Sequence, residues 1–227
     1  MNAFEFFISV LFFLSATVAA YRFFGKSGLF VFVAFSTILA NIQVCKGINL
    51  FGFETTVGNV LYASSFLCTD ILSEKYGKKT AQKAVKIGIF TNILWIIGTQ
   101  LTLISVPSEH DTMQPHLEAI FGLMPRVAGA SLIAYIISQS IDVLLYHLIW
   151  EKSGQTSKFL WLRNNGSTMV SQFFDTSIFV TIAFAGTVPS EIFWSILWTT
   201  YFFKVVVALF DTPFAYLARK LHAPDGE

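Results

Sequence analysis

A serine, a glutamine and an aspartate recur with the same spacing at two places in the chain. The pattern Ser-Gln-x-x-Asp occupies residues 138–142 and, 33 residues later, residues 171–175, each time inside an apolar run. Residues three and four apart share one face of a helix, so the polar side chains of each copy would point roughly the same way. The candidate ligand-binding residues in the two copies are Gln139, Asp142, Gln172 and Asp175.

Aspartate is unfavourable inside a membrane helix, by about 2.5–3.5 kcal/mol near the middle of the bilayer. Two such carboxylates, each accompanied by an amide, therefore indicate a polar cavity between two helices. The alternative is a pair of hydrogen-bonded clamps that only hold the helices together. A loop of about 17 residues separates the two apolar runs, which predicts neighbouring antiparallel helices with these faces meeting.

Further polar residues interrupt predicted spans. Asn41 and Asp70 lie in the second and third spans, and Lys204 lies in the seventh. We predict that all three contribute to the substrate-binding site. Lys204 is the single cation predicted within a span, so its simplest partner is Asp70 or one of the two repeated aspartates. Glu74 shares a helix face with Asp70 but comes beside a lysine-rich loop, where we expect a solvated helix end.

The composition is that of a membrane protein. The 227 residues are 54% hydrophobic and 13% charged, and the mean hydropathy is +0.62. The formal net charge of +1 excludes nucleic-acid binding through a basic field. The two cysteines are isolated and no zinc-ligand spacing is present, so we expect no cofactor and no metal.

Seven apolar segments predict an all-α, polytopic membrane helix bundle. The first segment is followed by basic residues and contains Glu5, which is typical of a retained helix rather than of a signal peptide. The segments cover residues 4–24, 29–46, 57–72, 87–106, 127–150, 168–188 and 192–217.

The distribution of Lys and Arg predicts how these segments cross the membrane. If the loop after the third segment is cytoplasmic, twelve of the 15 Lys and Arg residues lie inside and two lie outside. This asymmetry predicts seven spans in the inner (plasma) membrane, with the N-terminus outside and the C-terminus cytoplasmic.

Two connecting stretches have unusual compositions. Residues 47–53 are interrupted by glycine yet apolar, and such backbone at membrane depth either lines a cavity or forms a plain turn. The external loop 107–125 contains His110 and His116 beside acidic residues. Their spacing does not place them on one helix face as a metal site would require, so we expect a solvated loop.

The sequence contains none of the common catalytic templates, such as H-E-x-x-H, G-x-S-x-G, a P-loop or G-x-G-x-x-G. An intramembrane aspartyl protease would also use two helix-borne aspartates. However, neither Asp142 nor Asp175 has the Gly-rich flank expected of a substrate-accessible peptidase site. We therefore expect a protein that is not an enzyme.

Six sequence runs between residues 39 and 216, together with Lys204, resemble the queuosine precursor transporter family, which is grouped with the vitamin uptake transporters. The occurrence of all these motifs in the same order over this length identifies the family more specifically than any single motif does. The resemblance implies one membrane domain over residues 1–227, with a six-helix transporter core at 28–220 and an additional N-terminal transmembrane helix at 1–27. The runs are NIQVCK at 41–46, TDILSEKYGKKTA at 69–81, SLIAYIISQSID at 131–142, WLRNNGSTMVSQFFD at 161–175, IAFAG at 182–186 and TPFAY at 212–216.

The resemblance also implies a substrate class, the 7-deazaguanines: queuine or its precursors that carry a nitrile or an aminomethyl group, destined for tRNA modification. Such a base presents a ring N–H and an amino group side by side, which one carboxylate can bind with two parallel hydrogen bonds. Its carbonyl oxygen can accept from the amide of Gln139 or Gln172. Its flat ring can stack on an aromatic side chain, worth ~1–3 kcal/mol, and Tyr135 and Phe179 are the candidate platforms.

These expectations combine into an inner-membrane importer of queuosine precursors, whose partners are a small-molecule substrate and the lipid bilayer. The alternative is a substrate-binding membrane subunit that depends on a separate ATP-driven module. A third interpretation is a structural membrane protein, for which helix clamps suffice. No nucleic-acid partner is expected, and a homo-oligomer is compatible with the sequence.

Overall fold

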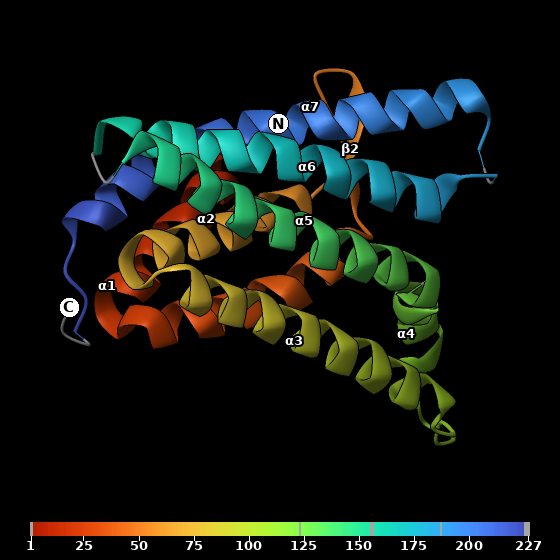
Figure 1. The fold of residues 1–227 in the computed structure, drawn as a ribbon. Coiled ribbons are helices and arrows are strands. Elements are labelled where there is room, and N and C mark those ends of the chain that lie inside the picture. The colour runs from red at the N-terminus through yellow and green to blue at the C-terminus, as the bar shows by residue number, and fades with distance from the viewer. Residues whose placement is uncertain (1, 123, 155–156, 187, 225–227) are drawn as a thin grey trace.

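The computed structural model describes residues 2–122, 124–154, 157–186 and 188–224. These residues form an all-α bundle that carries one short β-hairpin (Figure 1). The elements are α1 (Asn2–Gln43), β1 (Gly47–Leu50), β2 (Phe53–Thr56), α2 (Asn59–Tyr76), α3 (Lys78–Ile104), α4 (Gln114–Phe121), α5 (Met124–Ser153), the 3-10 turn η1 (Ser157–Phe159), α6 (Leu160–Phe184) and α7 (Ser190–Lys220).

The long element α1 is two helices joined by a sharp bend. At Gly25 the backbone has φ 58° and ψ −143°, a conformation that is unfavourable for residues other than glycine. Gly28 packs directly against Ala20, because a Cβ added to Gly28 would lie 2.3 Å from the carbonyl oxygen of Ala20. In a continuous helix, residues eight apart would be separated by about 12 Å along the axis. The two halves therefore fold back on each other, and they are the first two segments that the sequence predicts.

Among the described residues, four helices are long and apolar enough to cross a membrane. They are Ala3–Gln43, Lys78–Ile104, Arg126–Ser153 and Ser190–Lys220, from α1, α3, α5 and α7. At 1.5 Å per residue, Ala3–Gln43 would reach about 60 Å if straight, twice the hydrocarbon thickness, so the bend is needed to fit it in a bilayer.

The helices α2 and α6 carry more polar residues and bury them against the rest of the bundle. Fourteen of the 18 residues of α2 are buried, so its polar side chains meet protein rather than lipid. Buried polar residues are equally frequent along α6, where they include Asn164, Ser171, Gln172 and Asp175. The polar faces of α2 and α6 are thus covered by protein, which is how a membrane protein accommodates intramembrane polar groups.

The remaining predicted segments correspond to helices whose ends differ from expectation. The helix α6 begins at Leu160, eight residues before the predicted start at 168, because Arg163 and Asn164 are buried and paired instead of forming a loop. The helix α2 continues past residue 72 to Tyr76. The stretch 107–125, expected to be an external solvated loop, contains the helix α4.

The glycine-interrupted stretch after α1 forms an antiparallel hairpin, in which Gly47 pairs with Thr56 and Leu50 with Phe53. Phe51 and Gly52 both have positive φ, at 54° and 87°, as the tight turn of a two-residue hairpin requires. The backbone N–H of Gly52 donates to Oδ1 of Asn49 over 2.9 Å. The strand β2 contacts α7, and Figure 1 shows the hairpin crossing α7.

Candidate functional site

The two Ser-Gln-x-x-Asp copies face each other across α5 and α6 and are joined by reciprocal hydrogen bonds. Ser138 of the first copy donates to Oδ1 of Asp175 in the second over 2.9 Å. Ser171 of the second copy donates to Oδ1 of Asp142 in the first over 3.1 Å. This crossed pairing confirms that the two helices run antiparallel as neighbours, with the predicted faces in contact.

The second oxygen of Asp175 forms an ion pair with Lys204 of α7. The sequence left three acids open as partners of Lys204, and the fold selects Asp175. Both side chains are almost fully buried, with 5% of the Lys204 side chain and 2% of the Asp175 side chain exposed. The ammonium group also lies 4.7 Å from the ring centre of Tyr62 on α2, so α2, α6 and α7 meet at this pair.

The Asp175–Lys204 pair lines a cavity of about 670 Å³. The cavity lies between the C-terminal ends of α1 and α6, the N-terminal ends of α2, α5 and α7, the hairpin and α4. Its lining residues are Val44, Cys45, Gly47, Ile48, Asn49, Thr55, Thr56, Asn59, Tyr62, Ala119, Val127, Asp175, Phe179, Phe184, Ile196, Thr200 and Lys204. The irregular stretch predicted at 47–53 therefore contributes cavity wall.

The cavity wall combines aromatic faces with hydrogen-bonding groups. Tyr62 and Phe179 supply rings, and Asn59 and Thr55 supply an amide and a hydroxyl. The amide of Asn59 donates to Oγ1 of Thr55 over 2.8 Å, which fixes its orientation. An apolar wall with a few fixed polar groups and one buried charged pair is typical of a small-molecule site.

Two predicted site residues lie behind Tyr62 rather than on the cavity wall. Asn41 and Tyr135 line a small space of about 10 Å³ that Tyr62 also borders. The amide of Asn41 donates to Oδ1 of Asn92 over 3.3 Å, and the hydroxyl of Tyr62 is 2.6 Å from Oγ of Ser131. These residues support the Tyr62 side of the cavity from a second layer.

The other predicted site residues, Asp70, Gln139, Asp142 and Gln172, are buried and are not among the residues that line the cavity. Oε1 of Gln139 accepts from Thr69 of α2 over 3.3 Å. Asp142 accepts from Thr168 and Ser171 of α6. The fold therefore brings Asp175 and Lys204 together at the cavity and places these four residues deeper between the helices.

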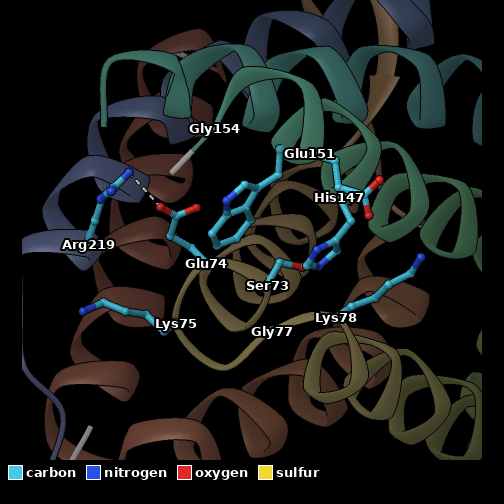
Figure 2. Close-up of a pocket in the computed structure, with 10 residues that line it drawn as sticks. Ser73, Glu74, Lys75, Gly77, Lys78, His147, Glu151, Gly154 and Arg219 are labelled. Atoms are coloured by element: carbon cyan, nitrogen blue, oxygen red, sulfur yellow. Dashed lines mark ion pairs between the residues drawn. The ribbon is translucent and has the colours of Figure 1, made fainter. Parts of the chain in front are cut away.

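A second cavity, of about 850 Å³, opens at the opposite end of the bundle, where Figure 2 shows Glu74 paired with Arg219. Glu74 was expected to be solvated, but only 7% of its side chain is exposed. It accepts from Arg163 at 2.9 Å, from Arg219 at 2.8 Å and from Tyr146 at 2.8 Å. Three helices besides α2 thus close this end on one carboxylate.

Sequence reasoning missed Tyr62 and Asn59 as cavity residues. Both lie in a segment that reads as a plain apolar run, and their spacing of three residues was the available signal for a shared face. It also missed Asp211, which accepts from Asn164 of α6. Within the described ranges, no group of three or more His, Cys, Asp or Glu side chains is arranged to hold a metal ion.

Comparison with known proteins gives one consistent family. Residues 56–218 match the family model described as "Putative vitamin uptake transporter". A protein of Bacillus subtilis (strain 168) named "Probable queuosine precursor transporter" is 44% identical over 97% of this chain and 95% of its own length. The "Queuosine precursor transporter" of Escherichia coli (strain K12) is 25% identical over 75% of each chain.

A protein of Haemophilus influenzae, also named "Probable queuosine precursor transporter", is 24% identical over 70% of this chain and 64% of its own length. No solved structure matches the chain. The family model covers well over half of the chain, and the Bacillus relative aligns along nearly all of it. The chain therefore belongs to the vitamin uptake transporter family, whose members are multi-pass membrane transporters rather than enzymes.

Proposed function

We propose that the protein imports queuosine precursors, the 7-deazaguanine bases, across the inner membrane. The observation that carries this proposal is the Asp175–Lys204 pair on the wall of a 670 Å³ cavity. Cavities of about 300–1,000 Å³ are the usual size for small-molecule sites. The names of the relatives, which are queuosine precursor transporters, support the same substrate class.

The chemistry of a deazaguanine complements this cavity. Its ring N–H and amino group would bind the two oxygens of Asp175 in parallel, and Lys204 would then donate to the carbonyl oxygen of the base. Tyr62 and Phe179 would sandwich or flank the flat ring, with stacking worth about 1–3 kcal/mol per base. Asn59 would bind a substituent of the base at the hairpin side.

The deeper candidates would meet the substrate later in transport. Gln139, Asp142 and Gln172 lie along the α5–α6 interface one helical turn or less from Ser138 and Asp175. When these helices separate, their amides and carboxylate would form the next part of the path. Asp70 would border that path from α2, while Asn41 and Tyr135 would hold Tyr62 in place.

The proposed topology has seven crossings, with the N-terminus outside and residues 1–27 as a helix added to a core at 28–220. Under this orientation the 670 Å³ cavity faces the exterior, and the Glu74 cluster closes the cytoplasmic end. The arrangement corresponds to an outward-facing state of an importer, in which substrate enters beside the hairpin.

Uptake tests the proposal directly. Labelled queuine, 7-cyano-7-deazaguanine and 7-aminomethyl-7-deazaguanine are supplied to cells that lack their own uptake and synthesis of these bases and that express this chain alone. We expect accumulation of at least one base and its appearance in tRNA, with vector-only cells as the control. If the cells show no uptake and the purified protein shows no binding, the proposal is rejected. Binding without uptake would indicate a subunit that needs another module.

A further inference from the structure

Three carboxyl groups from three different helices converge in the interior of the bundle, apart from the Asp175–Lys204 pair. They belong to Asp70 of α2, Asp142 of α5 and Asp211 of α7, each with at most 1% of its surface exposed. The carboxyl groups of Asp70 and Asp142 are close enough to share a hydrogen bond, and Asp211 interacts electrostatically with both.

No cation balances these three groups among the described residues. The ion pairs in the described parts of the chain use other acids, Glu74 and Asp175. The partners of the three carboxyl groups are neutral: Thr168 and Ser171 for Asp142, and Asn164 for Asp211. A bare anion buried in this way is strongly unfavourable.

Several oxygens of this cluster also have no hydrogen-bond partner among the described residues. They are both carboxyl oxygens of Asp70, and Oδ2 of Asp142 and of Asp211. A buried acceptor without a donor is destabilising, because it loses its hydrogen bonds to water and gains none in the protein. A proton placed between Asp70 and Asp142 would satisfy one oxygen of each and would remove one negative charge, so a shared proton is the simplest ligand for this arrangement.

A small cavity of about 10 Å³ lies between this cluster and the Glu74 end of the bundle. It is lined by Asp70, Tyr146, Glu74 and Arg219 among others, and the last two also line the 850 Å³ cavity of Figure 2. Its volume is close to that needed for one water molecule. One water would thus separate Asp70 from solvent at the end that the proposed topology makes cytoplasmic.

We propose that Asp70 and Asp142, assisted by Asp211, form a proton-binding site that couples proton movement to substrate transport. The proposal rests on the proposed function and adds the co-transported ion. In each cycle a hydronium ion of the outer solution gives up one proton, which forms an O–H bond with a carboxylate oxygen, and this bond breaks when the proton passes to water in the cytoplasmic cavity. The charged and titratable groups that face Asp70 are Asp142 and Tyr146 on α5, Asp211 on α7, and Cys68 and Glu74 on α2.

The test uses the full chain reconstituted in vesicles that contain a pH-sensitive dye. With the parent protein, addition of 7-cyano-7-deazaguanine outside is expected to acidify the lumen, and an inward proton gradient is expected to drive accumulation above equilibrium. Exchange of labelled for unlabelled substrate is measured in the same vesicles. If exchange proceeds but substrate never moves protons and the gradient has no effect, the coupling proposal is overturned while the proposed function stands.

Absence of exchange in the parent protein would reject the proposed function, and with it the coupling proposal. The variant that separates coupling from binding is Asp211→Asn, because Asp211 does not line the substrate cavity. It is expected to retain exchange and to lose most of the substrate-evoked acidification, and Asp70→Asn is expected to abolish the acidification. The matched control is Asp111→Asn on the exposed stretch before α4, which should acidify like the parent. Acidification by both cluster variants at the parent level would also overturn the proposal.

Discussion

Ser138 of α5 donates to one carboxylate oxygen of Asp175 on α6 over 2.9 Å, while Lys204 of α7 holds the other oxygen. Its counterpart Asp142 accepts from serine in the same way but has no cation among the described residues. Two copies of one sequence pattern thus have different electrostatic surroundings. Asp175 faces the cavity as a compensated charge, and Asp142 faces the interior carboxyl cluster.

Replacing Asp175 with Asn is expected to weaken deazaguanine binding about ten- to a hundredfold, because charge-assisted hydrogen bonds are worth roughly 1.5–3 kcal/mol. Calorimetry on the purified protein measures the affinity, and Asp111→Asn is the exposed control. Asp142→Asn tests whether the second copy also serves the substrate. If both Asn variants bind like the parent, the two copies are helix clamps and the site lies elsewhere.

Tyr62 is expected to act through its ring rather than through its hydroxyl. Tyr62→Leu should weaken binding about five- to a hundredfold, which corresponds to the loss of about 1–3 kcal/mol of stacking. Tyr62→Phe keeps the ring and the contact with Lys204, and should bind within a few-fold of the parent. Equal affinities for the Leu variant and the parent would remove Tyr62 from the site.

Cys45 provides a native reporter of cavity occupancy, since it lines the cavity and is exposed, whereas Cys68 is buried. Partial desolvation at the cavity wall raises the pKa of the Cys45 thiol above its ordinary value. Less thiolate is therefore present at neutral pH, and alkylation should accelerate as the pH is raised through that higher pKa. Mass spectrometry should find Cys45 modified and Cys68 unmodified, with a saturating deazaguanine slowing the reaction. Unchanged labelling with substrate would place the ligand away from the hairpin.

The orientation in the membrane can be checked with single cysteines in a background where Cys45 and Cys68 are replaced by serine. A cysteine near Lys79 should be shielded from an external impermeant thiol reagent, because the lysine-rich turn after α2 is predicted to be cytoplasmic. A cysteine near Asp111 should react. The opposite pattern would reject the topology with the N-terminus outside.

Glu74→Gln should destabilise the protein, because it removes the carboxylate that forms an ion pair with the fully buried Arg163 side chain. Breaking a buried ion pair from one side typically costs about 3–5 kcal/mol. Thermal unfolding in detergent measures the loss, and Glu109→Gln on an exposed stretch is the matched control. A melting temperature equal to that of the parent would show that the closed end does not depend on this carboxylate.

Several features of the bundle were readable from the sequence because they depend on local chemistry. The apolar runs mark helices directly, since every backbone polar group in a membrane must be paired within its own segment. The repeated Ser-Gln-x-x-Asp pattern marked the α5–α6 interface, because intramembrane polar side chains need partners. The family motifs, which are short local runs of sequence, indicated a transporter.

Tertiary structure decided which of these polar groups meet. Lys204 had three acids within reach in principle, and only the packing of α7 against α6 selects Asp175. Glu74 looks solvated in sequence because it stands beside lysines, yet Arg163 and Arg219 bring it inside from α6 and α7. Tyr62 and Asn59 became cavity residues because the hairpin closes over the start of α2. Such contacts join residues far apart in the chain, so they cannot be predicted from the residue spacing within any one helix.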